Sequence, residues 1–520
     1  MFETAELGRK VAKKAFDKAT PEMRVALLEL QQELRKADFP VIILFSGVDG
    51  AGKGETVNLL NEWMDPRWIE THAYTSSSEE ESERPEFWRY WRDLPARGRF
   101  GLFLSAWYSQ PFLDRVYDRI GDAEFDRRLD RIAAFERVLA DDGALILKFW
   151  MHLGKKAQQK RLKTLEKDPL LRWRVTKVDW EHWEKYDRFV EVAEHTIRRT
   201  SFARAPWKIV EGMDRHYRSL TVATIIRDAV GERLRNGIAP PPAVDVEVGE
   251  VSEAAADDPI AASLATSLER TVLTELDMSR TVSKDRYRQE LPKEQGRLNT
   301  LYRRAKNYGI SVVGVFEGWD AGGKGGAIRR LTAALDARDY RVIPVAAPTD
   351  EEAAQNYLWR FWRHLGRAGR VTIFDRSWYG RVLVERVEGF ASEPEWRRAF
   401  TEINEFERQL REHGIVLVKF WFHITPEEQL RRFEQRREVA YKKWKLTDED
   451  WRNREKWDRY ERAVQEMVER TSTFDAPWTL VEGNCKRFAR LKLLRTVSSA
   501  LESALASAEP EKKPKKNNKE

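Results

Sequence analysis

This sequence of 520 residues is poor in cysteine, has no long apolar run and does not begin with an apolar segment. Its single cysteine, Cys485, cannot form a disulfide within the chain, and no cysteine or histidine cluster surrounds it, so zinc and redox chemistry are not expected. No apolar run reaches the length of a membrane helix, and the opening MFETAELGRK lacks the apolar core of a signal peptide. We therefore expect a cytoplasmic protein without a membrane partner.

Apolar residues are nevertheless plentiful. Hydrophobic residues make up 42% of the chain and aromatic residues 11%, which is enough to build packed cores. At this length a chain usually divides into two domains. The net charge is +7, from 92 basic and 85 acidic residues, so the excess permits a polyanionic partner without requiring one.

An internal repeat organises the sequence. The segment GVDGAGKGE at 47–55 matches GWDAGGKGG at 318–326, which is an offset of 318 − 47 = 271 residues. The same offset, without a gap, aligns Trp88 with Trp359, FER at 135–137 with 406–408, KFW at 148–150 with 419–421 and APW at 205–207 with 476–478. The chain is therefore two copies of one domain.

Composition suggests where the copies begin and end. Residues 238–259 are rich in proline, alanine and acidic residues and lack apolar periodicity, which is typical of a linker. The end of the chain, 509–520, is polar and basic, and we expect a solvated, disordered tail. These limits predict one domain at 1–237 and a second at 260–508.

Short β-branched runs alternate with longer amphipathic stretches. In the second copy we predict strands at 312–316, 341–345, 371–374, 415–420 and 478–481, and in the first copy a corresponding first strand at 41–45. Thr425 followed by Pro426 and Glu428 predicts the start of a helix that runs to about Glu438. This alternation predicts an α/β fold in which each domain has a parallel sheet between two helical layers, with ligands at the carboxyl ends of the strands.

The first chemical motif follows the strand at 312–316. Residues 318–324 fit the phosphate-loop pattern G-x-x-x-x-G-K, in which backbone N–H groups surround a phosphate and the lysine, Lys324, adds a positive charge. We expect a helix at 325–335 to direct its positive dipole end at the same place. Gly325 stands where serine or threonine would normally bind Mg²⁺, which makes Asp320 a candidate metal ligand. The phosphate-binding candidates in the loop are Gly318, Gly322, Gly323, Gly325 and Gly326.

A second motif, DRSWYGR at 375–381, ends the strand at 371–374. Asp375 is placed as a Walker-B aspartate would be and is a candidate Mg²⁺ ligand. Arg376 and Arg381 could neutralise charge on a transferring phosphoryl group. A structural ion pair at a strand end is the other interpretation, and the neighbouring phosphate loop favours the catalytic one.

A third segment, YKKWKLT at 441–447, is basic and aromatic. Its candidate phosphate-binding residues are Lys442, Lys443 and Lys445, and four arginines precede it at 431, 432, 436 and 437. We expect this region to form a lid over the phosphates. Trp451, Trp457 and Tyr460, which follow with helical spacing, are interpreted as packing residues.

Together these motifs resemble the polyphosphate kinase 2 family, whose members carry a G-x-D-x-x-G-K-G loop, a D-R-S-W-Y-x-R segment and a K-x-W-K lid in this order. The tandem arrangement is similar to the two-domain polyphosphate:AMP phosphotransferase class. The resemblance implies tandem P-loop kinase-like domains with a helical lid, Mg²⁺-dependent phosphoryl transfer from inorganic polyphosphate to AMP giving ADP, and self-association. It assigns catalytic roles to Asp320, Lys324, Asp375, Arg376 and Arg381.

Two other functions stay open from the residues alone. The phosphate loop does not identify the phosphoryl donor, so an ATP-dependent nucleoside monophosphate kinase fits the same motifs. A non-catalytic binder of polyanions or nucleic acid is the second alternative, and the intact Lys324, Asp375 and Arg376 argue against it.

The first copy departs from the motif set. It keeps Asp49 and Lys53, but Leu104, Ser105 and Gln110 stand where the second copy has Asp375, Arg376 and Arg381. Leucine cannot bind a metal. The sequence therefore predicts that the first copy is catalytically degenerate.

Overall fold

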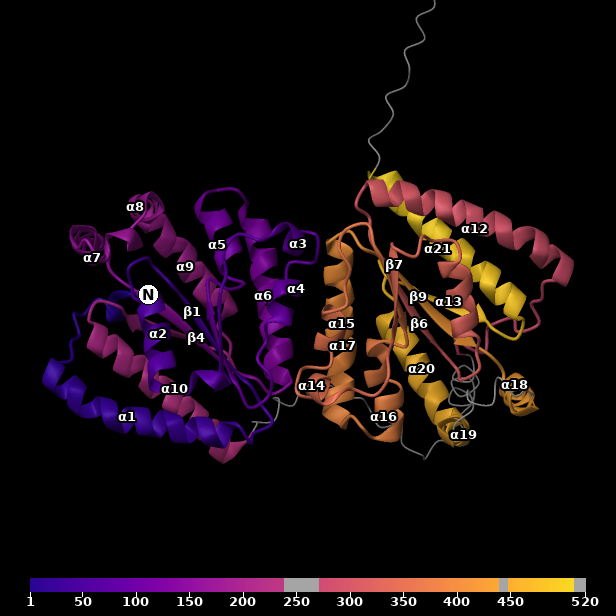
Figure 1. Ribbon diagram of the computed structural model, residues 1–520, viewed down its shortest axis with the longest axis horizontal. Coiled ribbons are helices and arrows are strands. Elements are labelled where there is room, and N and C mark those ends of the chain that lie inside the picture. The colour runs from indigo at the N-terminus through magenta and orange to yellow at the C-terminus, as the bar shows by residue number, and fades with distance from the viewer. Residues whose placement is uncertain (238–270, 439–447, 509–520) are drawn as a thin grey trace, which may run out of the picture. The chain divides into compact units, whose positions relative to one another are not determined.

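A computed structural model describes residues 1–237, 271–438 and 448–508. The bulk of each repeat forms one compact unit around its own sheet (Figure 1). The predicted linker at 238–259, the tail at 509–520 and the lid residues Lys442, Lys443 and Lys445 lie outside the described residues.

The first repeat alternates strands with helices. Its strands are β1 (Val41–Gly47), β2 (Ile69–Ala73), β3 (Phe100–Leu104), β4 (Leu145–His152) and β5 (Trp207–Glu211). Its α-helices are α1 (Lys13–Leu34), α2 (Lys53–Trp63), α3 (Glu79–Ser82), α4 (Trp88–Arg92), α5 (Ser109–Val116), α6 (Asp122–Asp141), α7 (Lys155–Lys167), α8 (Lys177–Glu184), α9 (Tyr186–Thr200) and α10 (Arg215–Asn236). Short 3₁₀ turns are η1 (Glu3–Ala5), η2 (Pro66–Trp68) and η3 (Arg172–Arg174).

The second repeat follows the same order. Its strands are β6 (Val312–Gly318), β7 (Tyr340–Pro344), β8 (Val371–Asp375), β9 (Val416–His423) and β10 (Trp478–Glu482). Its helices are α12 (Lys284–Asn307), α13 (Lys324–Thr332), α14 (Asp350–Ala353), α15 (Trp359–Trp362), η4 (Trp378–Arg381, a 3₁₀ turn), α16 (Val384–Glu388), α17 (Glu393–Glu412), α18 (Pro426–Glu438), α19 (Asp448–Glu455), α20 (Trp457–Thr471) and α21 (Lys486–Ala508).

Both sheets are parallel throughout and have equivalent strand orders, β2-β3-β1-β4-β5 and β7-β8-β6-β9-β10. The strand that precedes each phosphate loop, β1 or β6, is central. Its neighbour on one side is the strand that leads to the second motif, β3 or β8. Because carboxyl ends of parallel strands meet at one sheet edge, both motifs lie at the same edge. The predicted fold class is confirmed.

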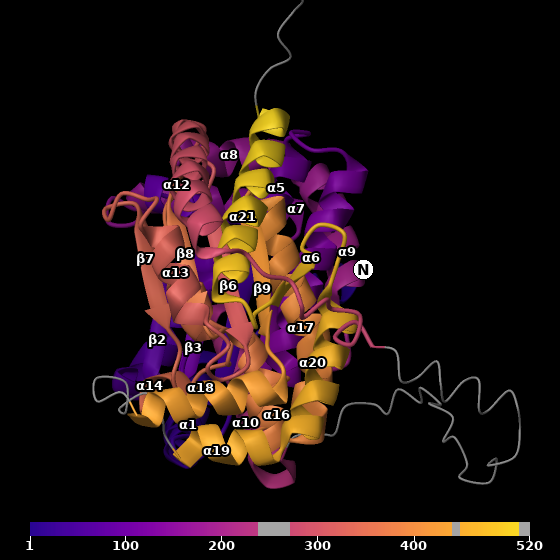
Figure 2. The ribbon, with the colours of Figure 1, turned by 90° about the vertical axis from the view of Figure 1, so that its right-hand side faces the viewer.

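Helices cover both faces of the second sheet (Figure 2). On one face α12, α13 and α21 pack together, and their apolar residues form a continuous core with β6, β8 and β9. On the other face α17 packs against β9 and α20. Every residue of β9 is buried, as expected for a parallel strand with helices on both sides.

The main difference from the predicted elements lies after the second gap. The sequence favours helical spacing from Asp448 to Tyr460, whereas the structure has α19 and α20 separated at Lys456. The aromatic residues do pack as predicted. Trp451 contacts the ring of Phe433, and Tyr460 is buried. The predicted start of α18 is also confirmed, because the Thr425 hydroxyl accepts a hydrogen bond from the backbone N–H of Glu428 at 3.3 Å.

No helix in the described part of the chain is long and apolar enough to cross a membrane.

Candidate active site

The second phosphate loop turns sharply between β6 and α13. Gly318 and Gly323 have φ values of 147° and 114°, conformations that a side chain rarely allows. A Cβ atom on Gly318 would lie 2.5 Å from the carbonyl oxygen of Phe422, so the loop rests directly on the end of β9. Gly325, by contrast, has no neighbour within 4 Å of a built Cβ atom. Space therefore requires glycine at the loop's start and not at position 325.

Lys324 is the first residue of α13 and folds back over the loop. Its ammonium group donates to the carbonyl oxygens of Gly318 and, at 3.5 Å, of Trp319. Lys53 in the first repeat does the same, at 2.6 Å to Gly47 and 3.2 Å to Val48. Both repeats thus retain the loop and lysine geometry that suits phosphate binding.

The sheet register brings the second motif to the loop. Asp375 is the last residue of β8 and pairs with Phe316 of β6, two residues before the loop begins. Arg376, the next residue, has a φ of 65°, and its guanidinium lies 3.5 Å from a carboxylate oxygen of Asp320. The structure therefore brings Arg376 to Asp320 and places Asp375 at the adjoining strand end, and the catalytic roles of the three residues stay a prediction.

Arg381 has other contacts. It ends the turn η4 and forms ion pairs with Glu385 at 3.2 Å and Glu395 at 3.8 Å. Its side chain is 15% exposed. Arg381 is thus paired with two glutamates, and it lies at the end of η4, whereas Arg376 precedes that turn. Its role at a phosphoryl group stays a prediction.

Asn453, on α19, is a site residue that motif reading missed. Its side-chain amide donates to Asp320 at 3.0 Å, so a helix next to the predicted lid contacts the loop's carboxylate. Trp457, which begins α20, stacks on Trp319 of the loop with ring centroids 3.6 Å apart. The repeat offset contains the signal for Asn453, because it aligns this residue with His182, which contacts Asp49 at 2.6 Å.

Arg432 is not part of a solvent-facing lid, contrary to its expected grouping with the lid's basic residues. It is 2% exposed and donates to the carbonyl oxygens of Ala321, Gly322 and Gly483 at 2.8, 3.0 and 2.6 Å. Burial lowers the pKa of its guanidinium, although the nearby Glu428 opposes this. Arg432 therefore supports the phosphate loop from beneath.

Glu317 is a second missed residue. It precedes Gly318 directly, is 6% exposed and accepts a hydrogen bond from the Ser377 hydroxyl at 2.8 Å. Burial raises the pKa of its carboxyl, while Lys324, Ser377 and Arg376 act in the opposite direction. A buried carboxylate thus lies between the two motifs of the second repeat.

In the first repeat the loop carboxylate, Asp49, has different partners from those of Asp320. Asp49 contacts His182 at 2.6 Å and Lys53 at 3.5 Å. Although burial raises the pKa of Asp49, these two partners outweigh it and lower the pKa to about 2. Gln110, at the position of Arg381, donates to Asp114 of its own helix at 2.8 Å.

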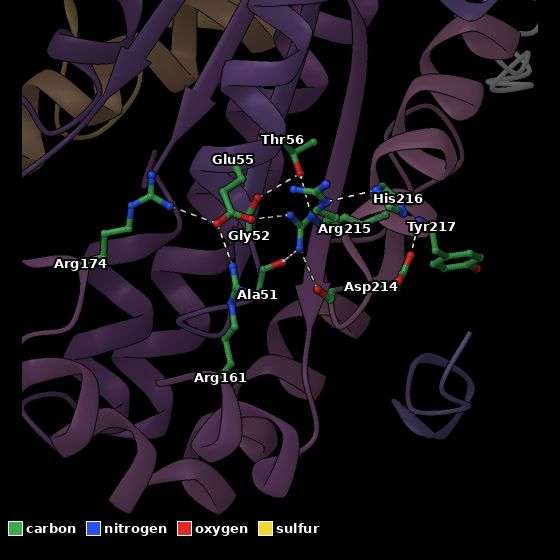
Figure 3. Close-up of polar contacts among 12 residues, drawn as sticks. Ala51, Gly52, Glu55, Thr56, Arg161, Arg174, Asp214, Arg215, His216 and Tyr217 are labelled. Atoms are coloured by element: carbon green, nitrogen blue, oxygen red, sulfur yellow. Dashed lines mark hydrogen bonds and ion pairs between the residues drawn. The ribbon is translucent and has the colours of Figure 1, made fainter. Parts of the chain in front are cut away.

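Three arginines surround Glu55 in the first repeat, and two of them, Arg161 and Arg174, are labelled in Figure 3. The carboxylate of Glu55 pairs with Arg161 at 2.8 Å, Arg174 at 3.1 Å and Arg218 at 2.7 Å. We call these four residues the Glu55 cluster. It lies at the N-terminal turn of α2, where the helix dipole favours an anion. The second repeat has Gly326 in place of Glu55, so only the first repeat supplies its own carboxylate there.

Within the Glu55 cluster, Arg218 also donates to the phosphate loop, as Arg432 does in the second repeat. It is 3% exposed and donates to the carbonyl oxygens of Ala51 at 3.3 Å and Gly212 at 2.8 Å, the counterparts of Gly322 and Gly483. The supporting arginine comes from α10 in one repeat and from α18 in the other.

Among the described residues, no group of three or more histidine, cysteine, aspartate or glutamate side chains is arranged to hold a metal ion. Mg²⁺ commonly binds through one or two carboxylates together with substrate phosphates and water. Asp320 lies in the loop and Asp375 at the end of the adjoining strand, so these two are the candidate carboxylates.

The fold and the site define a tandem protein with P-loop kinase-like domains. A model of the polyphosphate kinase 2 family matches residues 10–236 and 281–509, once in each repeat. The chain belongs to the polyphosphate kinase 2 family.

Several relatives share this tandem length. A polyphosphate:AMP phosphotransferase of Pseudomonas aeruginosa is 52% identical over 97% of this chain and 99% of its own. One of Acinetobacter johnsonii is 36% identical over 89% of this chain and 91% of its own. The crystal structure of a polyphosphate kinase 2 from Pseudomonas aeruginosa matches with a TM-score of 0.85 and 50% identity, over 97% of this chain and 99% of that one.

Proposed function

We propose that this chain is a polyphosphate:AMP phosphotransferase. A phosphate oxygen of AMP attacks the terminal phosphorus of inorganic polyphosphate, the bond to the bridging oxygen breaks, and the products are ADP and a chain shorter by one phosphate. The observation that carries the proposal is near full-length similarity, with 52% identity, to a protein of that activity in a chain whose second repeat retains both motifs.

Turnover is assigned to the second repeat. Phosphoryl transfer needs little covalent help from the protein and depends on positioning and on charge that stabilises the transition state. Lys324 and the loop N–H groups would bind the phosphate chain, and Arg376 would balance charge on the transferring group. The first repeat has Leu104 and Ser105 at the positions of Asp375 and Arg376, so it lacks the groups that transfer needs.

Asp320 and Asp375 are proposed to hold Mg²⁺. When bound there, the ion would neutralise charge on the phosphate oxygens. Arg376 lies against Asp320, and Asn453 donates to the same carboxylate, so these two contacts orient the group. The lysines at 442, 443 and 445 are proposed to contact the phosphate chain, together with Arg381.

The test uses the purified chain with AMP, Mg²⁺ and either polyphosphate or ATP as donor, and measures ADP by chromatography. With ATP, the adenylate product must be traced with labelled AMP, because ATP itself yields ADP. We expect ADP with polyphosphate and much less labelled ADP with ATP. Labelled ADP formed with ATP as donor, and none formed with polyphosphate, would assign the chain to the ATP-dependent kinases.

A further inference from the structure

The two repeats provide an internal control for buried polar groups. A group that the fold requires should occur in both repeats, whereas one that serves transfer should occur only in the second. The buried carboxylate of Glu407 belongs to the first kind. It accepts from Trp378 at 3.0 Å, Tyr379 at 2.6 Å and Lys419 at 2.7 Å.

The first repeat reproduces this network. Glu136 accepts from Trp107 at 3.0 Å, Tyr108 at 2.8 Å and Lys148 at 2.7 Å. The network is therefore part of the architecture and does not by itself indicate catalysis.

Glu317 and Ser377 belong to the second kind. The first repeat has Ser46 and Ala106 at these positions and so lacks both the carboxylate and the hydroxyl. The backbone there is nevertheless alike, because Ser105 has a φ of 50° where Arg376 has 65°. The strand pairing also corresponds, Phe45 with Leu104 and Phe316 with Asp375. The fold at this point does not need the pair.

Burying a carboxylate is costly unless hydrogen bonds or opposite charges offset the loss of water. For Glu317, burial raises the pKa of the carboxyl and Asp375 adds to this, while the Lys324 and Arg376 charges of the same site and the Ser377 hydrogen bond oppose it only in part. A buried ionisable group that the fold can replace, set beside a reaction centre, is characteristic of a functional site.

The geometry indicates how Glu317 acts. Ser377 is 3% exposed. Its hydroxyl oxygen accepts a hydrogen bond from the backbone N–H of Tyr379 at 3.3 Å, and the same hydroxyl donates a hydrogen bond to the Glu317 carboxylate. This chain of two hydrogen bonds runs from the end of β6 to the first turn of η4. It fixes the residue that directly follows Arg376 and so limits where the Arg376 guanidinium can lie relative to Asp320.

We propose that Glu317 is a positioning residue for phosphoryl transfer, which acts through the Ser377 hydroxyl to hold Arg376 at the phosphate loop. The proposal rests on the assignment of turnover to the second repeat. It concerns placement at the transition state and not the binding of the phosphate chain.

The experiment is a double-mutant cycle in the full chain with Glu317→Ser, Ser377→Ala and the two combined, which are the residues that the first repeat carries. Each single variant should lower kcat for ADP formation roughly tenfold to a hundredfold, the range expected when a reacting group is misplaced, with little change in KM for polyphosphate. Because both act through one hydrogen bond, the combined variant should be no slower than the worse single variant. Losses that multiply would overturn the proposal.

Glu317→Gln separates the hydrogen bond from the charge, because its amide oxygen still accepts from Ser377. It should recover most of the kcat lost in Glu317→Ser. If Gln is as slow as Ser, or if only the Glu317 variants need more Mg²⁺, the carboxylate acts directly on the metal or phosphate and the positioning role is wrong.

Ser46→Ala in the first repeat is the matched control, and thermal melting checks folding. A wild-type chain that uses only ATP would refute the proposed function, while the ratios between variants, measured with whichever donor works, would still test Glu317.

Discussion

At the end of β8 the second repeat has Asp375 and Arg376, whereas at the end of β3 the first repeat has Leu104 and Ser105. Both strands nevertheless have the same register with the central strand, and each is followed by a residue in the left-handed conformation. The first repeat therefore has the backbone conformation of the second without these two charged side chains. Packing and hydrogen bonding set the local backbone geometry, which does not depend on Asp375 and Arg376.

The same contrast separates support from function at each loop. Arg432 in one repeat and Arg218 in the other are buried against equivalent loop carbonyls, although they come from different helices. A buried donor to these carbonyls is thus a requirement of the loop. The position after the loop lysine and glycine differs, because it is Glu55 in one repeat and Gly326 in the other. The loop therefore does not require a particular side chain at this position.

The largest effect that we expect concerns the shared architecture. Lys419→Met leaves the buried carboxylate of Glu407 without its cation, and Lys148→Met does the same to Glu136. Breaking one partner of a buried ion pair costs about 3 to 5 kcal/mol. Because both pairs are 2.7 Å long and fully enclosed, the two variants should lose similar stability, measured by calorimetry of the full chain.

Exposed pairs give the control for this prediction. Lys155→Met removes the partner of Asp187 in an exposed pair and should cost less than about 1 kcal/mol. A large loss for Lys419→Met beside a small one for Lys148→Met would mean that the two networks are not equivalent.

The next effect separates the repeats by activity. Lys324→Ala removes the loop cation of the repeat that retains Asp375 and should reduce ADP formation roughly a hundredfold or more, as with other preorganised electrostatic groups. Lys53→Ala makes the identical change beside Leu104 and should leave most of the rate. Steady-state ADP formation by each variant, with melting temperatures as the folding check, is the measurement. Equal losses in two folded variants would show that the first repeat takes part in turnover.

Metal dependence provides a smaller difference. Asp375→Asn removes one of two proposed Mg²⁺ ligands, so it should lower kcat about tenfold or more and shift the Mg²⁺ titration to higher concentration. Asp49→Asn is the control, because this carboxylate already pairs with His182 and Lys53 and has no acidic partner at position 104. An unchanged Mg²⁺ titration for Asp375→Asn would show that the metal is bound elsewhere.

The fold was predictable because its signals are local and occur twice. Apolar β-branched runs gave all five strands of the second sheet within about three residues, and the repeated offset confirmed them. The position of Asp375 was predictable as well, because a parallel sheet brings carboxyl ends of strands to one edge.

What motif reading missed depends on distant packing. Arg432 looked like one of several lid cations, and only the docking of α18 against the loop shows that it is buried. Asn453 and Glu317 belong to no motif, and their contacts join segments separated by 133 and 60 residues. A position-by-position comparison of the repeats, which aligns Glu317 with Ser46 and Ser377 with Ala106, would have marked that pair as changing together with Asp375.

The smallest effect concerns the Glu55 cluster. Three arginines converge there on one carboxylate at the N-terminal turn of α2, so the site has a surplus of positive charge that Glu55 partly neutralises. Glu55→Gln removes that charge and keeps the helix. Measured in a Lys324→Ala background, which weakens the second site, it should bind polyphosphate a few-fold tighter at low salt, and the gain should shrink as salt rises. Glu124→Gln is the matched control, because it makes the same change in net charge beside Arg127 and Arg128 on α6. An equal gain in both variants would attribute the effect to overall charge. A gain confined to Glu55→Gln would show that the first repeat retains an anion site which its own carboxylate occupies, and no gain in either would mean that the arginines of the Glu55 cluster only stabilise the loop.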